Sequence, residues 1–319
     1  MTLHNLILDN YDIQITDLTL LDQYFGTEIY LAQTPNKRYI IKKLPPVVPN
    51  LENEDPLTRF LKQNGIPVSR LLLTKNGEGC VKTEQTQFHV QELIEGKTYR
   101  VNTAPLWLMD ESARLLGQIH CVLKNYGEMN VNFDKEFFIP SNANESTKHY
   151  IQQFAAAIEE KNIPLTSALD ERIKHLERIS AFTIETDKLT YTNSHGDFYI
   201  SQLIVSDRHV IVIDWTGACK LPAALEVMMS YVYAAPECKD GKINSDGLKR
   251  YIDRYGAHSQ LNYYDIKIMP YLFYFQQIMC HYPPPYDGIP DTYKPVCGLI
   301  NRFANWLYEH AEDLEKVLS

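Results

Sequence analysis

The sequence has no pattern of paired cysteines. Its 319 residues include six cysteines, but these are scattered and none forms a C-x-x-C pair. This spacing excludes the common zinc-binding motifs and a dense disulfide scaffold. We therefore expect reduced and mostly buried thiols, as in a cytoplasmic protein.

Long apolar runs and a surplus of positive charge are missing as well. The start, MTLHNLILDNYD, lacks the basic segment and the apolar core of a signal peptide. The most apolar later stretch, 268-IMPYLFYFQQIMC-280, is too short and too polar to cross a bilayer. The formal net charge of −9 argues against nucleic acid or an anionic membrane as a partner. Because no coiled-coil signal is present, we expect a monomer.

The pattern of apolar residues changes after the first third of the chain. Residues 1–95 contain short alternating runs, such as RYIIKKL (38–44) and FHVQELI (88–94), with one helix at about 52–64. Beyond them, apolar residues recur at helical spacing. The chain is also longer than the roughly 250–300 residues that one core supports. The sequence predicts an α+β fold of two lobes, a small antiparallel-sheet N-lobe over 1–95 and a large, mostly helical C-lobe over 96–319.

One hairpin is expected inside the helical part, and an aspartate accompanies each of its strands. Asp197 lies in the loop before 203-LIV-205, and Asp214 ends 210-VIVI-213. Both side chains would emerge on the same side of the hairpin, where two carboxylates usually hold a divalent cation or share acid–base work. A single aspartate more often caps a turn. A His-Gly-Asp loop, an amide five residues later and an aspartate ending an apolar strand are together hard to obtain by accident.

The order of these residues is that of a protein-kinase catalytic loop. Kinases have H-R-D, an Asn five residues after the Asp, and a second Asp after a following strand. Here the order is His195-Gly196-Asp197, then Gln202, then Asp214. In that chemistry the first Asp accepts the proton of the attacking hydroxyl, and the amide and second Asp hold magnesium on the nucleotide phosphates.

Three N-terminal features fit a nucleotide site, each with a plain alternative. Lys42 follows the strand run YII, where a lysine could reach the phosphates, but strand alternation does not separate it from Lys43. Glu54, in the next helix, could pair with that lysine or be an exposed carboxylate. The segment 91-QELIEG-96 could face an adenine edge or be an ordinary strand end.

Taken together, these segments resemble the aminoglycoside-phosphotransferase-like small-molecule kinases, a group that also holds choline, homoserine and methylthioribose kinases. The resemblance runs over most of the chain. It is most specific at the HGD loop and at 213-IDWTGACKLPAALEV-227. The weaker matches are YIIKKL, NGIPVSRLL, QELIEG and SARLLGQIH.

The resemblance implies a role for each matching residue. In the C-terminal part, Asp197 is the catalytic base, His195 braces its loop, and Asp214 is the principal Mg²⁺ ligand, with Gln202 at the place of a metal-binding Asn. The remaining implied roles are the phosphate lysine Lys42, its partner Glu54, adenine contacts from the backbone of Glu92 and Ile94, and a structural acid, Glu226.

The sequence departs from the family pattern at two places. Gln202 is one methylene longer than Asn, so fixing it as a ligand costs about 0.3–1 kcal/mol more side-chain entropy. The expected phosphate loop, 23-QYFGTEIYLA-32, has a single glycine, Gly26, although backbone N–H groups of 26–28 could still face phosphates.

The sequence therefore predicts an ATP- and Mg²⁺-dependent phosphotransferase acting on a hydroxyl of a small molecule, such as an aminoglycoside, an amino alcohol or a sugar. It does not separate ATP from GTP. The alternative is a non-catalytic nucleotide-binding or scaffold protein on a degenerate kinase fold. A metal-dependent hydrolase would leave the lysine strand unexplained. Tyrosines and acids at 262–277 and 281–293 suit a cationic or polyhydroxylated acceptor, or simply form core and surface loop.

Overall fold

The protein is described from a computed structural model. It covers residues 2–319 except for 25, 47–50, 140–147, 149–151, 153–154, 208, 281, 283–284, 290 and 292. The chain forms two compact units. The first unit is Met1–Thr98 with Gln202–Ala218, and the second unit is Tyr99–Ser201 with Cys219–Ser319.

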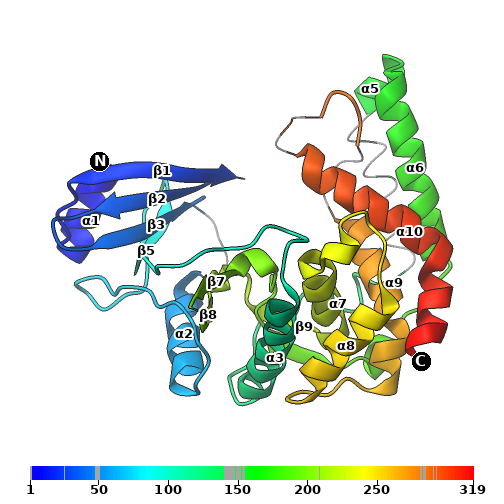
Figure 1. Ribbon diagram of the computed structural model, residues 1–319. Helices are drawn as coiled ribbons and strands as arrows, with labels where there is room; N and C mark the ends of the chain where they lie inside the picture. The colour runs from blue at the N-terminus through cyan, green and yellow to red at the C-terminus, as the bar shows by residue number, and fades with distance from the viewer. Residues whose placement is uncertain are drawn as a thin grey trace. The chain divides into compact units, whose positions relative to one another are not determined.

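The first unit is built on a five-stranded antiparallel sheet of order β1-β2-β3-β5-β4 (Figure 1). Among its described residues, two helices and a further hairpin, separate from the sheet, complete this unit. Its elements are α1 (Leu3–Tyr11), β1 (Asp17–Tyr24), β2 (Thr27–Gln33), β3 (Arg38–Leu44), α2 (Glu54–Gln63), β4 (Val81–Lys82), β5 (Gln87–Glu92), β7 (Leu203–Ser206) and β8 (His209–Val212). Short 3-10 turns lie at Leu51–Asn53 and Trp215–Gly217.

The two faces of the sheet carry different side chains. Ile41, Phe88 and Val90 lie in a core cluster with Ile7 and Tyr11 of α1. Because successive side chains of a strand point to opposite faces, the residue after Ile41 points away from this core. That residue is Lys42, whose cross-strand partner on β5 is His89. The alternation thus directs these two basic residues to the face opposite α1.

The hairpin β7–β8 belongs to the first unit through backbone pairing. Val68 bridges to Val212 in parallel, and Lys97 exchanges hydrogen bonds of 2.9 and 3.0 Å with Val205. Through this pairing, the end of the hairpin that carries Asp214 belongs to the same unit as the five-stranded sheet. The division at residues 95 and 96 as a domain boundary stays a prediction.

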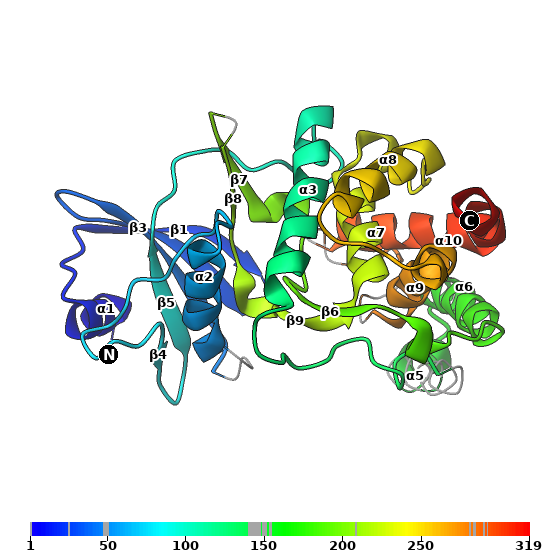
Figure 2. The ribbon, with the colours of Figure 1, turned by 90° about the horizontal axis from the view of Figure 1, so that it is seen from below.

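The second unit is mainly helical. Its two-stranded sheet pairs β6 (Tyr191–Ser194) with β9 (Cys219–Pro222). Helix α7 lies between α3 and α9 (Figure 2). Almost all of its side chains are buried. Within the described residues, the helices are α3 (Leu106–Leu123), α5 (Ala155–Glu159), α6 (Ile163–Ser180), α7 (Ala223–Ala234), α8 (Ser245–Gly256), α9 (Tyr263–Met279) and α10 (Lys294–Leu318).

The predicted fold class is confirmed, with an antiparallel sheet in the N-terminal part and helices in the C-terminal part. Within the part of the chain that the structure describes, every helix is too short or too polar to cross a bilayer.

Candidate active site

Lys42 and Asp214 form the central ion pair of the first unit. The Nζ atom of Lys42 lies 2.5 Å from Oδ1 of Asp214 and 3.3 Å from Oγ1 of Thr216. The two charged side chains are only 11% and 21% exposed. Lys43 points to the other face and pairs with Glu28 at 2.7 Å, which lowers the pKa of the Glu28 carboxyl group. The structure therefore brings Lys42, and not Lys43, to Asp214.

Asp214 is held in an unusual backbone conformation. Its φ and ψ are 63° and 69°, in the left-handed region, which costs a residue with a Cβ about 1 kcal/mol. The Thr216 hydroxyl donates to Oδ1 of Asp214 at 2.7 Å. Such strain persists only where neighbouring contacts fix the backbone, and it is common at ligand-binding positions.

Gln202 lies in the same small region as Asp214. The N–H of Ile213, the residue before Asp214, donates to the Gln202 carbonyl at 3.0 Å. A carboxylate and an amide oxygen are hard donors of the kind that Mg²⁺ prefers, so these residues fit the implied metal. Among the described residues, no group of three or more His, Cys, Asp or Glu forms a metal site. A cation held by Asp214 would therefore need further oxygens, such as phosphates or water.

Glu54 has partners other than the predicted lysine. It is the first residue of α2 and is 2% exposed. Its Oε1 atom accepts a 3.3 Å hydrogen bond from the N–H of Trp215, and its Oε2 atom lies 3.1 Å from Nδ1 of His89. The structure thus joins Glu54 to the backbone that follows Asp214, whereas Lys42 itself is paired with Asp214.

His89 is a site residue that sequence reasoning passes over. Its side chain is 3% exposed and stands in β5 between apolar neighbours. The signal in the sequence is a lone imidazole in the run 88-FHVQELI-94, whose first three residues are buried. The sequence does not show which residue this imidazole contacts, because Glu54 lies 35 positions earlier and on another element.

The predicted adenine and phosphate-loop residues lie at element ends. Glu92 ends β5, its carboxylate pairs with Lys37 at 2.6 Å, and Ile94 follows two residues later. Gly26 occupies the turn between β1 and β2 with φ of 78°, a conformation that favours glycine. An added Cβ there would lie 3.2 Å from Cγ of Pro45. Nucleotide contacts at these positions stay a prediction.

The His-Gly-Asp loop lies in the second unit, directly after β6. His195 is fully buried, and its Nδ1 atom accepts a 3.3 Å hydrogen bond from the N–H of Asp197. Gly196 has φ of 83°, so the loop turns at the one residue without a Cβ. Asp197 itself is half-buried, and its carbonyl accepts from the N–H of Tyr199 at 2.8 Å. The imidazole therefore caps the turn that presents the aspartate.

A network of buried polar side chains holds this loop in place. Oε1 of Glu226, on α7, accepts the N–H of Gly196 at 2.8 Å, and Oε2 lies 3.0 Å from Nε2 of His120. The same imidazole contacts Ser194 Oγ at 2.5 Å and Tyr255 Oη at 2.8 Å. Glu226 and His120 are both fully buried. Glu226 thus has the position of a structural acid.

Three tyrosines, Tyr199, Tyr233 and Tyr282, feel the charge of Asp197. The rings of Tyr199 and Tyr233 meet edge to face, with centroids 4.8 Å apart. Burial raises the pKa of both phenols, and the charge of Asp197 raises it further, so both stay neutral near pH 7. Tyr282 has the same two causes of a raised pKa. These phenols supply neutral hydrogen-bonding groups near Asp197.

The tyrosine- and acid-rich segments divide between core and surface. The stretch 262–277 lies largely in α9, where most of the side chains are buried. It is therefore mainly core. Part of 281–293 lies outside the described residues, including His281.

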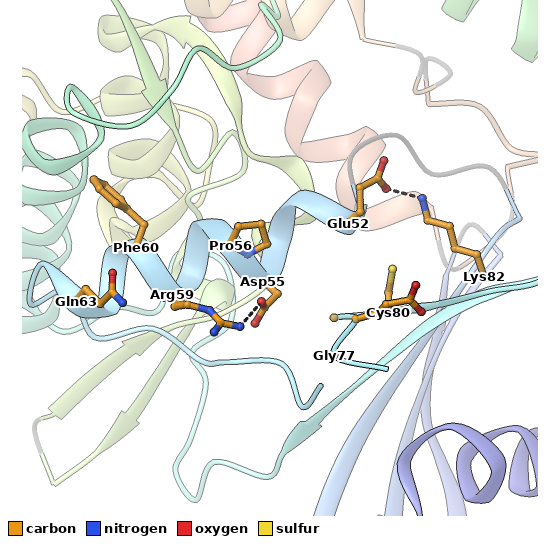
Figure 3. Close-up of a pocket in the computed structure, with 11 residues that line it drawn as sticks. Glu52, Asp55, Pro56, Arg59, Phe60, Gln63, Gly77, Cys80 and Lys82 are labelled. Atoms are coloured by element: carbon orange, nitrogen blue, oxygen red, sulfur yellow. Dashed lines mark hydrogen bonds and ion pairs between the residues drawn. The ribbon is translucent and has the colours of Figure 1, made fainter. Parts of the chain in front are cut away.

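A separate cleft lies on the first unit and holds none of the predicted site residues. It measures about 790 Å³ and lies between α2 and residues 77–82 (Figure 3). Its walls carry two ion pairs, Arg59 with Asp55 at 2.7 Å and Lys82 with Glu52 at 2.5 Å. The cleft is thus separate from the Lys42–Asp214 pair.

Comparison with known proteins identifies the family. A model of the phosphotransferase enzyme family (APH) matches residues 18–261, more than half of the chain. The chain belongs to this family. No curated protein matches it in sequence. The predicted resemblance is thus confirmed at the level of the family.

Several solved structures share the fold of this chain at low sequence identity. An amicoumacin kinase is 14% identical with a TM-score of 0.65, over 96% of this chain and 92% of its own. A microcompartment-associated aminopropanol kinase is 14% identical with a TM-score of 0.64, over 98% of both chains. Choline kinase from Cryptosporidium parvum Iowa II is 11% identical with a TM-score of 0.56, over 94% of this chain and 89% of its own.

Proposed function

We propose that the protein is a small-molecule kinase that transfers the γ-phosphoryl group of ATP to a hydroxyl group with the help of Mg²⁺. The observation that carries this proposal is the buried pairing of Lys42 with Asp214, the two residues that the family resemblance assigns to phosphate and metal. The related amicoumacin kinase structure contains AMP-PNP and Ca²⁺, and that of a spectinomycin phosphotransferase contains ADP. These ligands support a nucleotide and a divalent cation for this chain.

In the first unit, Lys42 and Asp214 would exchange their mutual contact for contacts with the ligand. Lys42 would bind phosphate oxygens, and Asp214 with the Gln202 amide would hold the cation. The cation supplies neutralisation of the charge that develops on the phosphates. The ion pair at 2.5 Å keeps both groups buried and compensated until then.

In the second unit, Asp197 would accept the proton of the acceptor hydroxyl. General-base catalysis of this kind contributes roughly 10²–10⁴-fold to a rate. Its efficiency depends on a fixed orientation of the carboxylate. The contacts of Gly196 with Glu226 and of Asp197 with His195 support such an orientation.

The acceptor we propose is a small polar alcohol of the aminoglycoside, amino alcohol or sugar type. The relatives named above include kinases of amicoumacin, aminopropanol and choline. The neutral phenols of Tyr199 and Tyr233 near Asp197 suit hydroxyl or ammonium groups, through hydrogen bonds and cation–π contacts.

A second candidate is a protein that binds the nucleotide without transferring phosphate. Two features favour it: Gln202 in place of Asn, and the single glycine of the phosphate loop. The first should weaken binding of the metal ion, and the second should weaken binding of the phosphates. The two candidates differ in turnover and not in the fold.

A screen of acceptors tests the proposal. ADP release is measured with ATP, Mg²⁺ and a panel of amino alcohols, sugars and aminoglycosides, and Asp197→Asn serves as the matched control. Acceptor-dependent ADP release by the wild type, lost in the variant, is the expected result. Release that is equal in both proteins, or that needs no acceptor, would contradict a kinase reaction with Asp197 as base.

A further inference from the structure

One buried polar side chain of the first unit has no part in the proposed chemistry. His89 on β5 is 2% exposed, and its Nδ1 atom lies 3.1 Å from Oε2 of Glu54. Neither atom has a well-aligned hydrogen-bond partner among the described residues. The two atoms lie within hydrogen-bond distance of each other but are not well aligned, and an imidazole N–H is a donor that could satisfy this carboxylate oxygen.

The other oxygen of Glu54 leads to the proposed metal ligand. Oε1 accepts the N–H of Trp215 at 3.3 Å, and Trp215 follows Asp214 directly. Asp214 has the left-handed backbone conformation that neighbouring contacts must maintain. A single buried carboxylate thus connects strand β5 to the backbone that aims Asp214.

We propose that His89 is a positioning residue for the metal-binding end of the β7–β8 hairpin. It orients Glu54, and Glu54 fixes the Trp215 amide and through it Asp214. The role of Asp214 as a metal ligand rests on the proposed function. The contacts that connect His89 through Glu54 to residues 213–215 do not depend on that function.

The position of Lys42 explains why residue 89 must donate a hydrogen to Glu54. Lys42 is the cross-strand partner of His89, so a cation stands beside the imidazole on the same face of the sheet. A Glu54 carboxylate that has lost its imidazole is buried and uncompensated, and it would turn toward this cation. That movement would withdraw the acceptor from Trp215 and would compete with the Lys42–Asp214 pair.

Two nearly isosteric variants separate the polar role from the packing role. His89→Gln keeps a side-chain N–H that can reach Glu54, and His89→Met fills a similar volume without a donor. His175→Met is the control, because His175 is an equally buried imidazole in the second unit, bonded to Tyr274 and Asn305 at 2.7 and 2.9 Å.

Two measurements are made on each protein. The first is amide hydrogen exchange of residues 210–218 without any ligand. The second is the Mg²⁺ concentration that gives half of the metal-dependent ATP binding. In His89→Met we expect exchange to rise roughly tenfold and the Mg²⁺ midpoint to rise roughly five- to tenfold, the size of effect that follows from the loss of one polar contact to a buried group. His89→Gln and His175→Met should stay within about twofold of wild type in both.

Several results would overturn the proposal. The first is unchanged amide exchange of residues 210–218 in His89→Met. The second is an equal rise in exchange in His89→Gln and His89→Met. The third is an equal rise in the control, His175→Met. If the wild type shows no metal-dependent ATP binding, the proposed function fails, but the exchange data still decide the role of His89. If His89→Met does not fold, Glu54→Gln is added to it to remove the unpaired charge. Because the neutral amide is not drawn to Lys42, exchange should then return to within about twofold of wild type, and a tenfold rise in this double variant would overturn the proposal.

Discussion

The two segments that carry the proposed catalytic residues are stabilised in different ways. The Asp197 loop, in the second unit, is fixed by a fully buried network of Glu226, His120 and Ser194, which includes no lysine or arginine. The Asp214 segment, in the first unit, is held by an ion pair with Lys42 that a nucleotide would have to replace. Under the proposed function, the base would be organised in advance, whereas the phosphate and metal residues would change partners on binding. Substitutions in the two segments should have different consequences.

The largest effect is expected at the base. Asp197→Asn should lower kcat by roughly 10²–10⁴-fold, because the proton acceptor is lost while the shape of the side chain is kept. The affinity for ATP with Mg²⁺, measured by calorimetry, should stay within about twofold. An equal loss of affinity and turnover would mean that Asp197 binds nucleotide instead.

The next effect tests the buried network that supports the base. Glu226→Ala removes the acceptor of Gly196 N–H and leaves His120 without its carboxylate, so the free energy of unfolding should fall by about 3 kcal/mol. Turnover of the protein that remains folded should fall more than ATP affinity. A variant with wild-type stability in denaturant unfolding would contradict the described role of Glu226.

A matched pair of lysines sharpens the comparison within the first unit. Lys42→Met should weaken the binding of ATP with Mg²⁺ by roughly tenfold or more, since a phosphate-binding cation is lost and Asp214 is left uncompensated. Lys43→Met removes a half-exposed pair with Glu28 and should change ATP binding less than about twofold. Titration calorimetry of both variants checks this order, and the reverse order would reassign the phosphate lysine.

The smallest effect concerns Gln202. Gln202→Asn shortens the proposed amide ligand and should raise turnover at limiting Mg²⁺ by about two- to fivefold, the equivalent of the entropy difference stated above. The Mg²⁺ dependence of the rate is the measurement. A change from no activity to clear activity would instead favour the non-catalytic candidate for the wild type.

The sequence predicts the parts of this site that depend on local patterns. The HGD loop and the aspartate after VIVI follow from residues that are close together in the chain. The choice between Lys42 and Lys43 does not follow, because it depends on which face of β3 meets Asp214, about 170 positions later. A central strand with polar residues on both faces gives no alternation from which to decide.

Glu54 and His89 show the same limit more clearly. The helix start at Glu54 suggests a partner for the lysine, as in kinases generally. The structure gives that carboxylate to His89 and to the Trp215 amide, contacts that depend on the packing of α2 against β5 and the hairpin. Contacts that join three separate elements in this way cannot be predicted from local sequence patterns.

The most direct test of the account is a calorimetric titration of ATP into the purified protein with and without Mg²⁺, repeated with Asp214→Asn. The account predicts binding that is much tighter with Mg²⁺ in the wild type and a loss of that metal dependence in the variant. Binding that ignores Mg²⁺ in the wild type, or no binding at all, would contradict a working nucleotide site at Lys42 and Asp214.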